Sequence, residues 1–277
     1  MRIEIGARVI ACCVLLAGGE ACVQRNERQQ SYETVFYPSG KLKIEAYVFK
    51  PEGTGPFSIV IYNHGSRAGH DREERPFAYV GEMLARSGYV VVVPERRGYG
   101  KSDGPTFSET VGEDRGTRFV TRVQEETDDV LAAVEFVKTL PYADSKRVGV
   151  MGWSFGGIVS VFAASRSSAF RVVVDQAGAA LTWERSPEMQ KALKGAARKI
   201  QIPLLGMVAE NDRTESVKAV VREAEAGGAI GKLIVYPAFT PPDAGGVAPG
   251  HMIFGREGWR IWEADVQEFL SKHLSGQ

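Results

Sequence analysis

Short, unbroken apolar runs recur along the chain and alternate with stretches whose apolar residues follow a helical spacing. Runs of the first kind predict strands that are buried on both faces, as in a parallel sheet. They are Ser58–Tyr62, Tyr89–Val93, Val148–Met151, Val172–Val174, Leu204–Ala209 and Leu233–Tyr236. Stretches of the second kind predict amphipathic helices at Pro76–Arg86 and Asp129–Thr139. The alternation predicts an α/β fold, with a mainly parallel central sheet and helices on both faces.

A different pattern precedes these elements. Residues 32–50 alternate apolar and polar side chains, as strands with one solvated face do. The turn pair Ser39-Gly40 separates Val35 and Tyr37 from a second alternating run. The apolar positions of that run are Leu42, Ile44, Ala46 and Val48. Two alternating runs joined by a turn predict an antiparallel N-terminal hairpin, which we expect at an edge of the sheet.

Length and charge narrow the class of protein. The 277 residues can bury a full hydrophobic core and suit one large α/β domain. Lysine plus arginine equals aspartate plus glutamate at 34 each, so no net field draws the chain to nucleic acid. The sequence has no internal repeat and no low-complexity linker. We therefore expect a polar linker at residues 22–30, a single domain at residues 31–277, and no nucleic-acid partner.

Residues 1–21 have the pattern of a bacterial signal peptide. Arg2 and Arg8 give a weakly basic start, and the apolar run Val9–Ala17 is too short to span a bilayer. Gly18–Ala21 offers small residues at the spacing that a signal peptidase accepts. Cleavage after Ala21 predicts an exported protein, periplasmic or secreted, and an uncleaved N-terminus is the alternative.

Cleavage at that point would make Cys22 the first residue of the mature chain, as in a bacterial lipoprotein. The lipoprotein signal has an aliphatic and then a small residue where this chain has Gly19 and Glu20. A lipid on Cys22, which would be the chain's link to a membrane, is therefore the lesser alternative. Cys12 and Cys13 would leave with the signal, so the mature chain would hold one cysteine and no internal disulfide.

The segment Val148–Gly157 carries the clearest chemical signal. It contains the G-x-S-x-G pattern Gly152-Trp153-Ser154-Phe155-Gly156, preceded by a predicted strand and followed by a predicted helix. A sharp turn between strand and helix lifts the serine clear of the sheet, and the glycines remove Cβ atoms that would clash there. Ser154 is therefore the candidate nucleophile.

A serine hydroxyl needs an imidazole to take its proton and a carboxylate to orient that imidazole. We expect His251, in the loop between the last strand and the helix Trp259–Leu274, to be the base, because His273 lies on that helix. Asp212 follows the strand Leu204–Ala209 and is the preferred carboxylate. Asp175, after the preceding strand, and Glu210 remain alternatives.

Backbone N–H groups are expected to stabilise negative charge on the substrate carbonyl oxygen. The residue after the nucleophile, Phe155, supplies one donor. The second is expected from Asn63–Ser66, which follows an earlier strand and in which Gly65 permits close approach. The N–H of Ser66 is the candidate. His64 then shapes this loop, and His70 is expected at the surface.

These residues together resemble an α/β-hydrolase, closest to the dienelactone hydrolase-like and prolyl oligopeptidase-like serine hydrolases. The resemblance covers about Phe57 to Leu274 and is carried by five motifs. They are Asn63-His-Gly-Ser66, Arg97-Gly-Tyr-Gly-Lys-Ser102, Gly152–Gly157, Asp212 and Gly250-His251. It implies the α/β-hydrolase fold, a catalytic triad in the order Ser154, Asp212, His251, and no metal or organic cofactor.

Two departures bear on the substrate. Dienelactone hydrolases have a cysteine nucleophile, so Ser154 argues against that activity. The oligopeptidases have a propeller-sized domain before the catalytic part, for which this chain has no counterpart, and this favours cleavage of small carboxylic esters. A peptidase or amidase acting on short peptide-like substrates, an acyltransferase, and a non-catalytic envelope binding protein are the alternatives. Gly104–Glu126 and Pro237–Gly250 are expected to be loops beside the site, the first as a partial lid.

Overall fold

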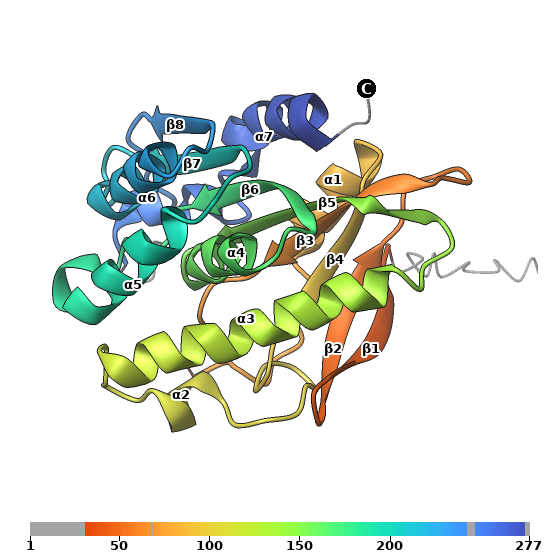
Figure 1. The fold of residues 1–277 in the computed structure, drawn as a ribbon, viewed down its shortest axis with the longest axis horizontal. Coiled ribbons are helices and arrows are strands. Elements are labelled where there is room, and N and C mark those ends of the chain that lie inside the picture. The colour runs from red at the N-terminus through yellow and green to blue at the C-terminus, as the bar shows by residue number, and fades with distance from the viewer. Residues whose placement is uncertain (1–30, 68, 243–246, 275–277) are drawn as a thin grey trace, which may run out of the picture. The chain divides into compact units, whose positions relative to one another are not determined.

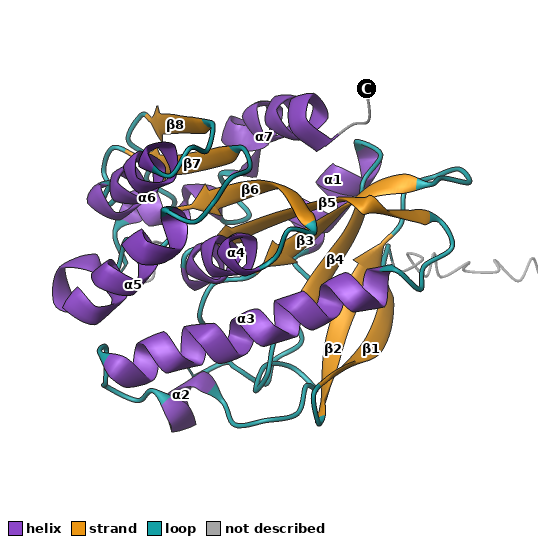
Figure 2. Ribbon diagram, in the orientation of Figure 1, coloured by secondary structure: helices purple, strands orange, loops and turns teal. Residues whose placement is uncertain are grey.

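The apolar runs of the sequence form one sheet, in the order β1-β2-β4-β3-β5-β6-β7-β8 (Figures 1 and 2). This computed structural model describes residues 31–67, 69–242 and 247–274. The predicted signal peptide, the polar linker and Cys22 lie outside the described residues. The strands are β1 (Glu33–Ser39), β2 (Leu42–Phe49), β3 (Phe57–Asn63), β4 (Val90–Glu95), β5 (Ala143–Trp153), β6 (Phe170–Gln176), β7 (Leu204–Ala209) and β8 (Gly231–Tyr236).

The sheet is mainly parallel, as predicted. β1 and β2 form the antiparallel hairpin, with Ser39 opposite Leu42, and β2 also runs antiparallel to β4. The pairs from β4 through β3, β5, β6 and β7 to β8 are all parallel. The two alternating runs of the sequence thus form one edge, and the unbroken apolar runs form the remainder of the sheet.

Both faces of the central strands are buried, which explains why these strands are mainly apolar. In β4, Val90 and Val92 pack into one core, and Val91 and Val93 pack into the other. Helices α3, α4, α5 and α6 contribute to the first core, and α1 and α7 to the second. The helices are α1 (Ala78–Arg86), α2 (Phe107–Thr110), α3 (Thr117–Val137), α4 (Phe155–Arg166), α5 (Pro187–Ala197), α6 (Glu215–Ala226) and α7 (Trp259–Leu274).

The prediction that Gly104–Glu126 is a loop is wrong for its second half. Helix α3 begins at Thr117, twelve positions before the predicted start at Asp129, and the short helix α2 precedes it. The charged residues in this half suggested a solvated loop, but Arg122 and Glu126 are buried and paired with each other. The long α3 helix crosses the front of the sheet in Figure 1.

The strand order reverses direction at β3, because the chain passes from β3 to β4 on one side and then to β5 on the other. Parallel sheets bind ligands at such a reversal, beyond the carboxyl ends of the strands. β3 and β5 are hydrogen-bonded neighbours, and Asn63 at the end of β3 lies opposite Gly152. The loop after β3 and the turn after β5 therefore emerge side by side.

Candidate active site

The chain turns sharply between β5 and α4, and Ser154 lies at the turn. Its backbone has φ 58° and ψ −118°, a strained conformation that non-glycine residues seldom adopt and that clusters at functional sites. The Ser154 N–H donates to Gln176 O at the end of β6 over 2.8 Å. Ser154 is partly exposed, whereas Gly152 and Phe155 are buried. The backbone thus presents this serine at the surface, directly before the buried Phe155.

Glycines around Ser154 allow three backbone segments to meet. A Cβ on Gly152 would lie 2.3 Å from Gly156 O, and a Cβ on Gly156 would lie 2.0 Å from Asn63 O. A Cβ on Gly65 would lie 3.3 Å from Ser154 Cβ. A larger residue at Gly152 would collide with the first turn of α4, and a larger residue at Gly156 would push α4 away from the β3 loop. The G-x-S-x-G spacing therefore has a steric cause in this fold.

His251 and Asp212 are joined by a hydrogen bond. His251 Nδ1 lies 2.8 Å from Asp212 Oδ2, and both side chains are buried. The other carboxylate oxygen of Asp212 accepts the N–H of Arg213 at 2.7 Å. This bond to the carboxylate places the proton of a neutral His251 on Nδ1 and leaves Nε2 as an acceptor. A histidine held in this way can take a proton from a hydroxyl group.

Trp153 links His251 to the turn that carries Ser154. The Trp153 indole N–H donates to His251 O at 3.1 Å, and the two rings lie 5.7 Å apart. His251 Nε2 is buried and has no hydrogen-bond partner among the described residues, so no hydrogen bond joins it to Ser154. Catalytic hydrogen bonds are often absent without substrate and form in its complex.

The two alternative carboxylates lie elsewhere. Asp175 is fully buried, and its Oδ1 accepts the N–H of Gly178 at 2.9 Å. A Cβ on Gly157 would lie 2.4 Å from that oxygen, so Asp175 is enclosed beneath the first turn of α4. Burial raises the pKa of Asp175 to about 7. Glu210 is exposed and accepts the N–H of Ala238 at 3.0 Å. Of the three candidates, the structure joins Asp212 to His251.

The proposed oxyanion donors border a cavity of about 190 Å³ that contains Ser154. Ser66 reaches it from the loop after β3 and Phe155 from the first turn of α4. Aromatic and aliphatic side chains make up much of its wall, and two arginines also line it. The remaining lining residues are Phe107, Arg115, Phe119, Ile158, Ala179, Leu181, Thr182 and Arg185. The segment Gly104–Glu126 therefore borders the cavity through Phe107, Arg115 and Phe119, although part of it is helical.

The other histidines have different surroundings. His64 is buried, and its Nδ1 lies 2.7 Å from Gly65 O within the β3 loop. Burial lowers the pKa of His64, and the charges of Arg96 and Arg67 lower it further. His70 is exposed beside Glu73. His273, on α7, packs against the ring of Phe269, and burial lowers its pKa.

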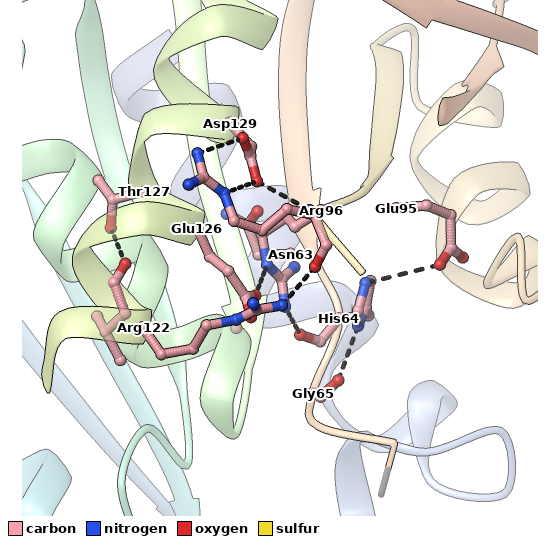
Figure 3. A network of polar contacts seen from close by, with 12 residues as sticks. Asn63, His64, Gly65, Glu95, Arg96, Arg122, Glu126, Thr127 and Asp129 are labelled. Carbon is pink, nitrogen blue, oxygen red and sulfur yellow. Dashed lines mark hydrogen bonds and ion pairs between the residues drawn. The ribbon is translucent and has the colours of Figure 1, made fainter. Parts of the chain in front are cut away.

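Sequence reasoning missed a cluster of buried charges behind the β3 loop (Figure 3). Arg96 pairs with Glu126, and Arg67 pairs with Glu95; all four are almost fully inaccessible to solvent. The one available signal is the position of Glu95 and Arg96, two charged residues directly after the apolar run Val90–Pro94. Their partners lie 28 and 30 positions away in the sequence, so spacing alone could not identify them.

A larger cavity, of about 900 Å³, lies between α3, α4 and α5 and contains none of the predicted site residues. Its lining mixes acidic and basic side chains, among them Asp128 and Arg166, which pair with each other. The described residues contain no group of three or more His, Cys, Asp or Glu side chains arranged to hold a metal ion. Nor is any helix among them long and apolar enough to cross a membrane.

Parts of this chain are similar to known hydrolase sequences. The Prolyl oligopeptidase family matches residues 76–188, which include the turn at Ser154. A putative carboxymethylenebutenolidase of Aquifex aeolicus is 26% identical over 183 residues, which cover 65% of this chain and 71% of that protein.

Solved structures share the fold. An acylaminoacyl peptidase of Pyrococcus horikoshii has a TM-score of 0.65 at 19% identity, over 89% of this chain and 42% of the peptidase chain. An esterase of Pyrococcus furiosus has a TM-score of 0.63 at 21% identity, over 88% of this chain and 92% of the esterase chain. This chain therefore spans less than half of the peptidase and nearly all of the esterase. The resemblance drawn from the sequence is confirmed.

Proposed function

We propose that this chain, which has the α/β-hydrolase fold, is a serine hydrolase that cleaves carboxylic esters through an acyl-enzyme. Ser154 Oγ attacks the ester carbonyl carbon while His251 Nε2 takes the hydroxyl proton. Asp212 holds the imidazole and stabilises its charged form. The N–H groups of Phe155 and Ser66 stabilise the negative charge on the carbonyl oxygen.

Acylation ends when His251 gives its proton to the leaving alcohol as the ester C–O bond breaks, and the acyl group remains on Ser154 as an ester. In the second half of the reaction His251 takes a proton from water, which attacks that ester. His251 then gives this proton to Ser154 Oγ as the bond between Oγ and the acyl carbon breaks, which releases the carboxylic acid and restores the serine. No metal or organic cofactor takes part in these steps. An alcohol or amine in place of water would make the same chain an acyltransferase.

The hydrogen bond between Asp212 and His251, beside a strained serine turn, is the observation that carries the proposal. Both features carry a cost in stability. A left-handed serine costs roughly 1–3 kcal/mol, and a buried histidine and carboxylate lose their hydration. Such costs are typical of a site that is organised for chemistry rather than for stability.

The size of the cavity beside Ser154 favours ester substrates with a short acyl group. Its volume of about 190 Å³ is below the range of drug-sized pockets, and the rings of Phe107 and Phe119 bound it. The match to the Prolyl oligopeptidase family favours the second candidate, a peptidase or amidase that would use the same residues. A non-catalytic binding protein, the third candidate, would have no need of an ordered Asp212–His251 pair.

The test compares two panels of chromogenic substrates. Short-chain p-nitrophenyl esters and aminoacyl p-nitroanilides are offered to the wild type, to Ser154→Ala and to Ser108→Ala, which changes an exposed serine on α2. We expect ester turnover that falls by about 10⁶-fold in Ser154→Ala alone. Turnover confined to the anilides would replace the esterase with the peptidase. The absence of Ser154-dependent turnover on both panels would contradict either enzyme.

We also propose that the chain is exported, on the pattern of residues 1–21 alone. Expression of the full chain in a Gram-negative bacterium, followed by fractionation and N-terminal sequencing, tests it. A mature chain that begins at Cys22 in the periplasm supports export, and a cytoplasmic chain that retains Met1 contradicts it. The variant Cys22→Ser separates lipidation from simple cleavage, because it would shift a lipoprotein from the membrane to the soluble fraction.

A further inference from the structure

Two charged residues at the end of β4 hold the loop that carries the proposed oxyanion donor. Glu95 and Arg96 are fully buried, and each reaches the loop after the neighbouring strand β3. Arg96 Nη2 donates to His64 O at 2.8 Å. Glu95 accepts two hydrogen bonds from the guanidinium group of Arg67, one of them at 3.1 Å. The donor residue, Ser66, thus lies between two anchored residues, His64 and Arg67.

A third bond acts on the peptide group that contains the donor itself. His64 Nδ1 lies 2.7 Å from Gly65 O, and the carbonyl of Gly65 and the N–H of Ser66 belong to the same planar group. Fixing the oxygen on one edge of that group fixes the direction of the N–H on the other. A neutral His64 with its proton on Nδ1 can donate this bond, which also polarises the Ser66 N–H.

The imidazole of His64 is itself held by aromatic rings. The Phe77 ring lies parallel to it with centroids 5.6 Å apart, and the Tyr99 ring meets it edge-on at 4.6 Å. Phe77 has a left-handed backbone, with φ 51°, at the N-cap of α1. The conformation of the loop therefore depends on contacts from several elements and not on its own sequence alone.

Arg96 is fixed from the opposite side by helix α3. Its Nε donates to Glu126 Oε2 at 2.7 Å, and the other oxygen of Glu126 accepts from Arg122 Nε at 2.6 Å. The guanidinium carbon of Arg96 also lies 5.8 Å from the centre of the Phe155 ring. Figure 3 shows Arg96 between Glu126 and the His64 carbonyl. Arg96 thus contacts both segments that supply the proposed oxyanion donors.

The stability of the fold alone does not explain why these charged residues are buried. Three buried arginines (Arg67, Arg96 and Arg122) share two buried carboxylates, Glu95 and Glu126. Removing such charges from water is costly, and apolar residues of similar volume are often as stable or more so. What apolar residues cannot supply is a directed hydrogen bond to a particular carbonyl group. The network is therefore suited to fixing a backbone position.

We propose that Arg96 is a positioning residue of the oxyanion hole, because it holds the His64 carbonyl and thereby directs the Ser66 N–H. Glu126 holds Arg96 in place, and the Glu95–Arg67 pair anchors the other end of the loop. This inference rests on the proposed function, because it assigns a role in the reaction of Ser154. Arg96 touches no reacting atom. Its loss should weaken stabilisation of the transition state and leave ground-state binding of the ester unchanged.

The neighbouring pair Arg97–Asp129 provides a matched control. Arg97 Nη2 lies 2.8 Å from Asp129 Oδ1, and Asp129 follows Glu126 by about one turn of α3. Among the described residues, the side chains of this pair make no hydrogen bond to the β3 loop. Arg96→Met breaks a buried ion pair just after β4, and Arg97→Met breaks a part-buried one beside it. Both variants should lower the melting temperature. Only Arg96→Met should lower kcat for a p-nitrophenyl ester, by about 10- to 100-fold with KM unchanged, less than the 10²–10³-fold typical of a deleted donor.

A sulfur substrate distinguishes a displaced donor from a general disturbance. A thionoester places C=S where the ester has C=O, and sulfur is a weak acceptor of hydrogen bonds. The wild type should strongly prefer the ester. In Arg96→Met this preference should shrink at least tenfold, whereas a disturbance of Ser154 or His251 would slow both substrates equally.

Two further variants keep the test decisive if Arg96→Met does not fold. Glu126→Gln retains the volume of the support but removes its charge, and it should show the same loss of ester preference in weaker form. Arg96→Lys can reach His64 O or Glu126 but not both, and it should recover only part of kcat. The inference would be overturned if folded Arg96 or Glu126 variants had the same kcat as Arg97→Met and the same preference for the ester over the thionoester. Absence of Ser154-dependent turnover in the wild type would instead overturn the proposed function.

Discussion

His251 Nδ1 lies 2.8 Å from Asp212 Oδ2, although the two residues are 39 positions apart in the sequence. The loop after β7 carries Asp212, and the short helical turn Pro249–Phe254 carries His251. Gly250 lets these segments approach, because a Cβ there would lie 2.3 Å from Asn211 Oδ1. Substitution of Asp212 therefore tests whether this hydrogen bond is needed for catalysis.

Asp212→Asn should lower kcat for esters by about 10⁴-fold, because the amide no longer favours the histidine tautomer that can accept the serine proton. The comparison variant is Glu210→Gln, which removes a carboxylate two residues away that bonds to Ala238 instead. Steady-state kinetics on one p-nitrophenyl ester should show less than about a threefold change for it. Similar losses in both variants would argue against Asp212 as the orienting acid.

The strands and the serine turn could be predicted from the sequence because their signals are local. A strand buried on both faces is apolar throughout, and the turn needs small residues at fixed offsets from Ser154. The hairpin β1–β2 was predicted from its alternation and its Ser39-Gly40 turn. These elements agree with the structure to within a few residues, apart from β5, which begins at Ala143.

Which aspartate pairs with His251, Asp175 or Asp212, could not be decided from local sequence. Both follow a run of apolar residues in the sequence, and their local sequences do not distinguish them. Only the path of the loop that carries His251, set by packing across β7 and β8, brings one of them within hydrogen-bonding distance. The same holds for Glu95 and Arg96, whose role depends on partners from α3 and from the loop after β3. Such contacts are properties of the tertiary structure.

Asp175 should make the stability of the protein depend on pH. Its pKa is raised to about 7 by burial, so between its ordinary value of 3.8 and pH 7 the folded chain holds a proton that the unfolded chain lacks. Stability from this group is present at low pH and is lost as pH rises through about 7. Between pH 5 and 8 the wild type should lose about 2–3 kcal/mol of unfolding free energy more than Asp175→Asn, which mimics the protonated form.

Urea denaturation of the two proteins at both pH values measures this difference. Glu95, whose pKa burial also raises to about 7 against the opposing charge of Arg67, is present in both proteins and cancels. Parallel pH dependences in wild type and variant would show that Asp175 stays ionised throughout and would contradict the prediction.

Gly195→Ala should stabilise the protein by about 0.5–1 kcal/mol, because glycine inside a helix is less favourable than alanine by that amount. Gly195 lies in α5, and a Cβ there meets nothing within 4 Å. Gly156→Ala, at the first turn of α4, should do the opposite, since its Cβ would lie 2.0 Å from Asn63 O. Thermal unfolding of both variants checks the pair, and a destabilised Gly195→Ala would be inconsistent with this packing.

Phe107→Leu should move the substrate preference toward longer acyl chains. The Phe107 ring lines the cavity beside Ser154 and meets the Phe155 ring edge-on at 5.3 Å. A smaller side chain enlarges the cavity. One methylene group in an apolar pocket contributes about 1–3 kcal/mol to substrate discrimination. The ratio of kcat/KM for the octanoate ester to kcat/KM for the butyrate ester should therefore rise by about 3- to 10-fold. Phe136→Leu, on α3 beside Tyr37, should leave the ratio unchanged. An unchanged ratio in Phe107→Leu would mean that the acyl chain lies elsewhere.

The central claim is that Ser154 is the nucleophile, and covalent labelling tests it most directly. The purified chain is treated with a fluorophosphonate, digested and examined by mass spectrometry. The account predicts a single phosphonylated serine, Ser154, with labelling abolished in Ser154→Ala and slowed in Arg96→Met but not in Arg97→Met. An unlabelled wild-type protein, or a label on another serine that survives Ser154→Ala, would contradict it.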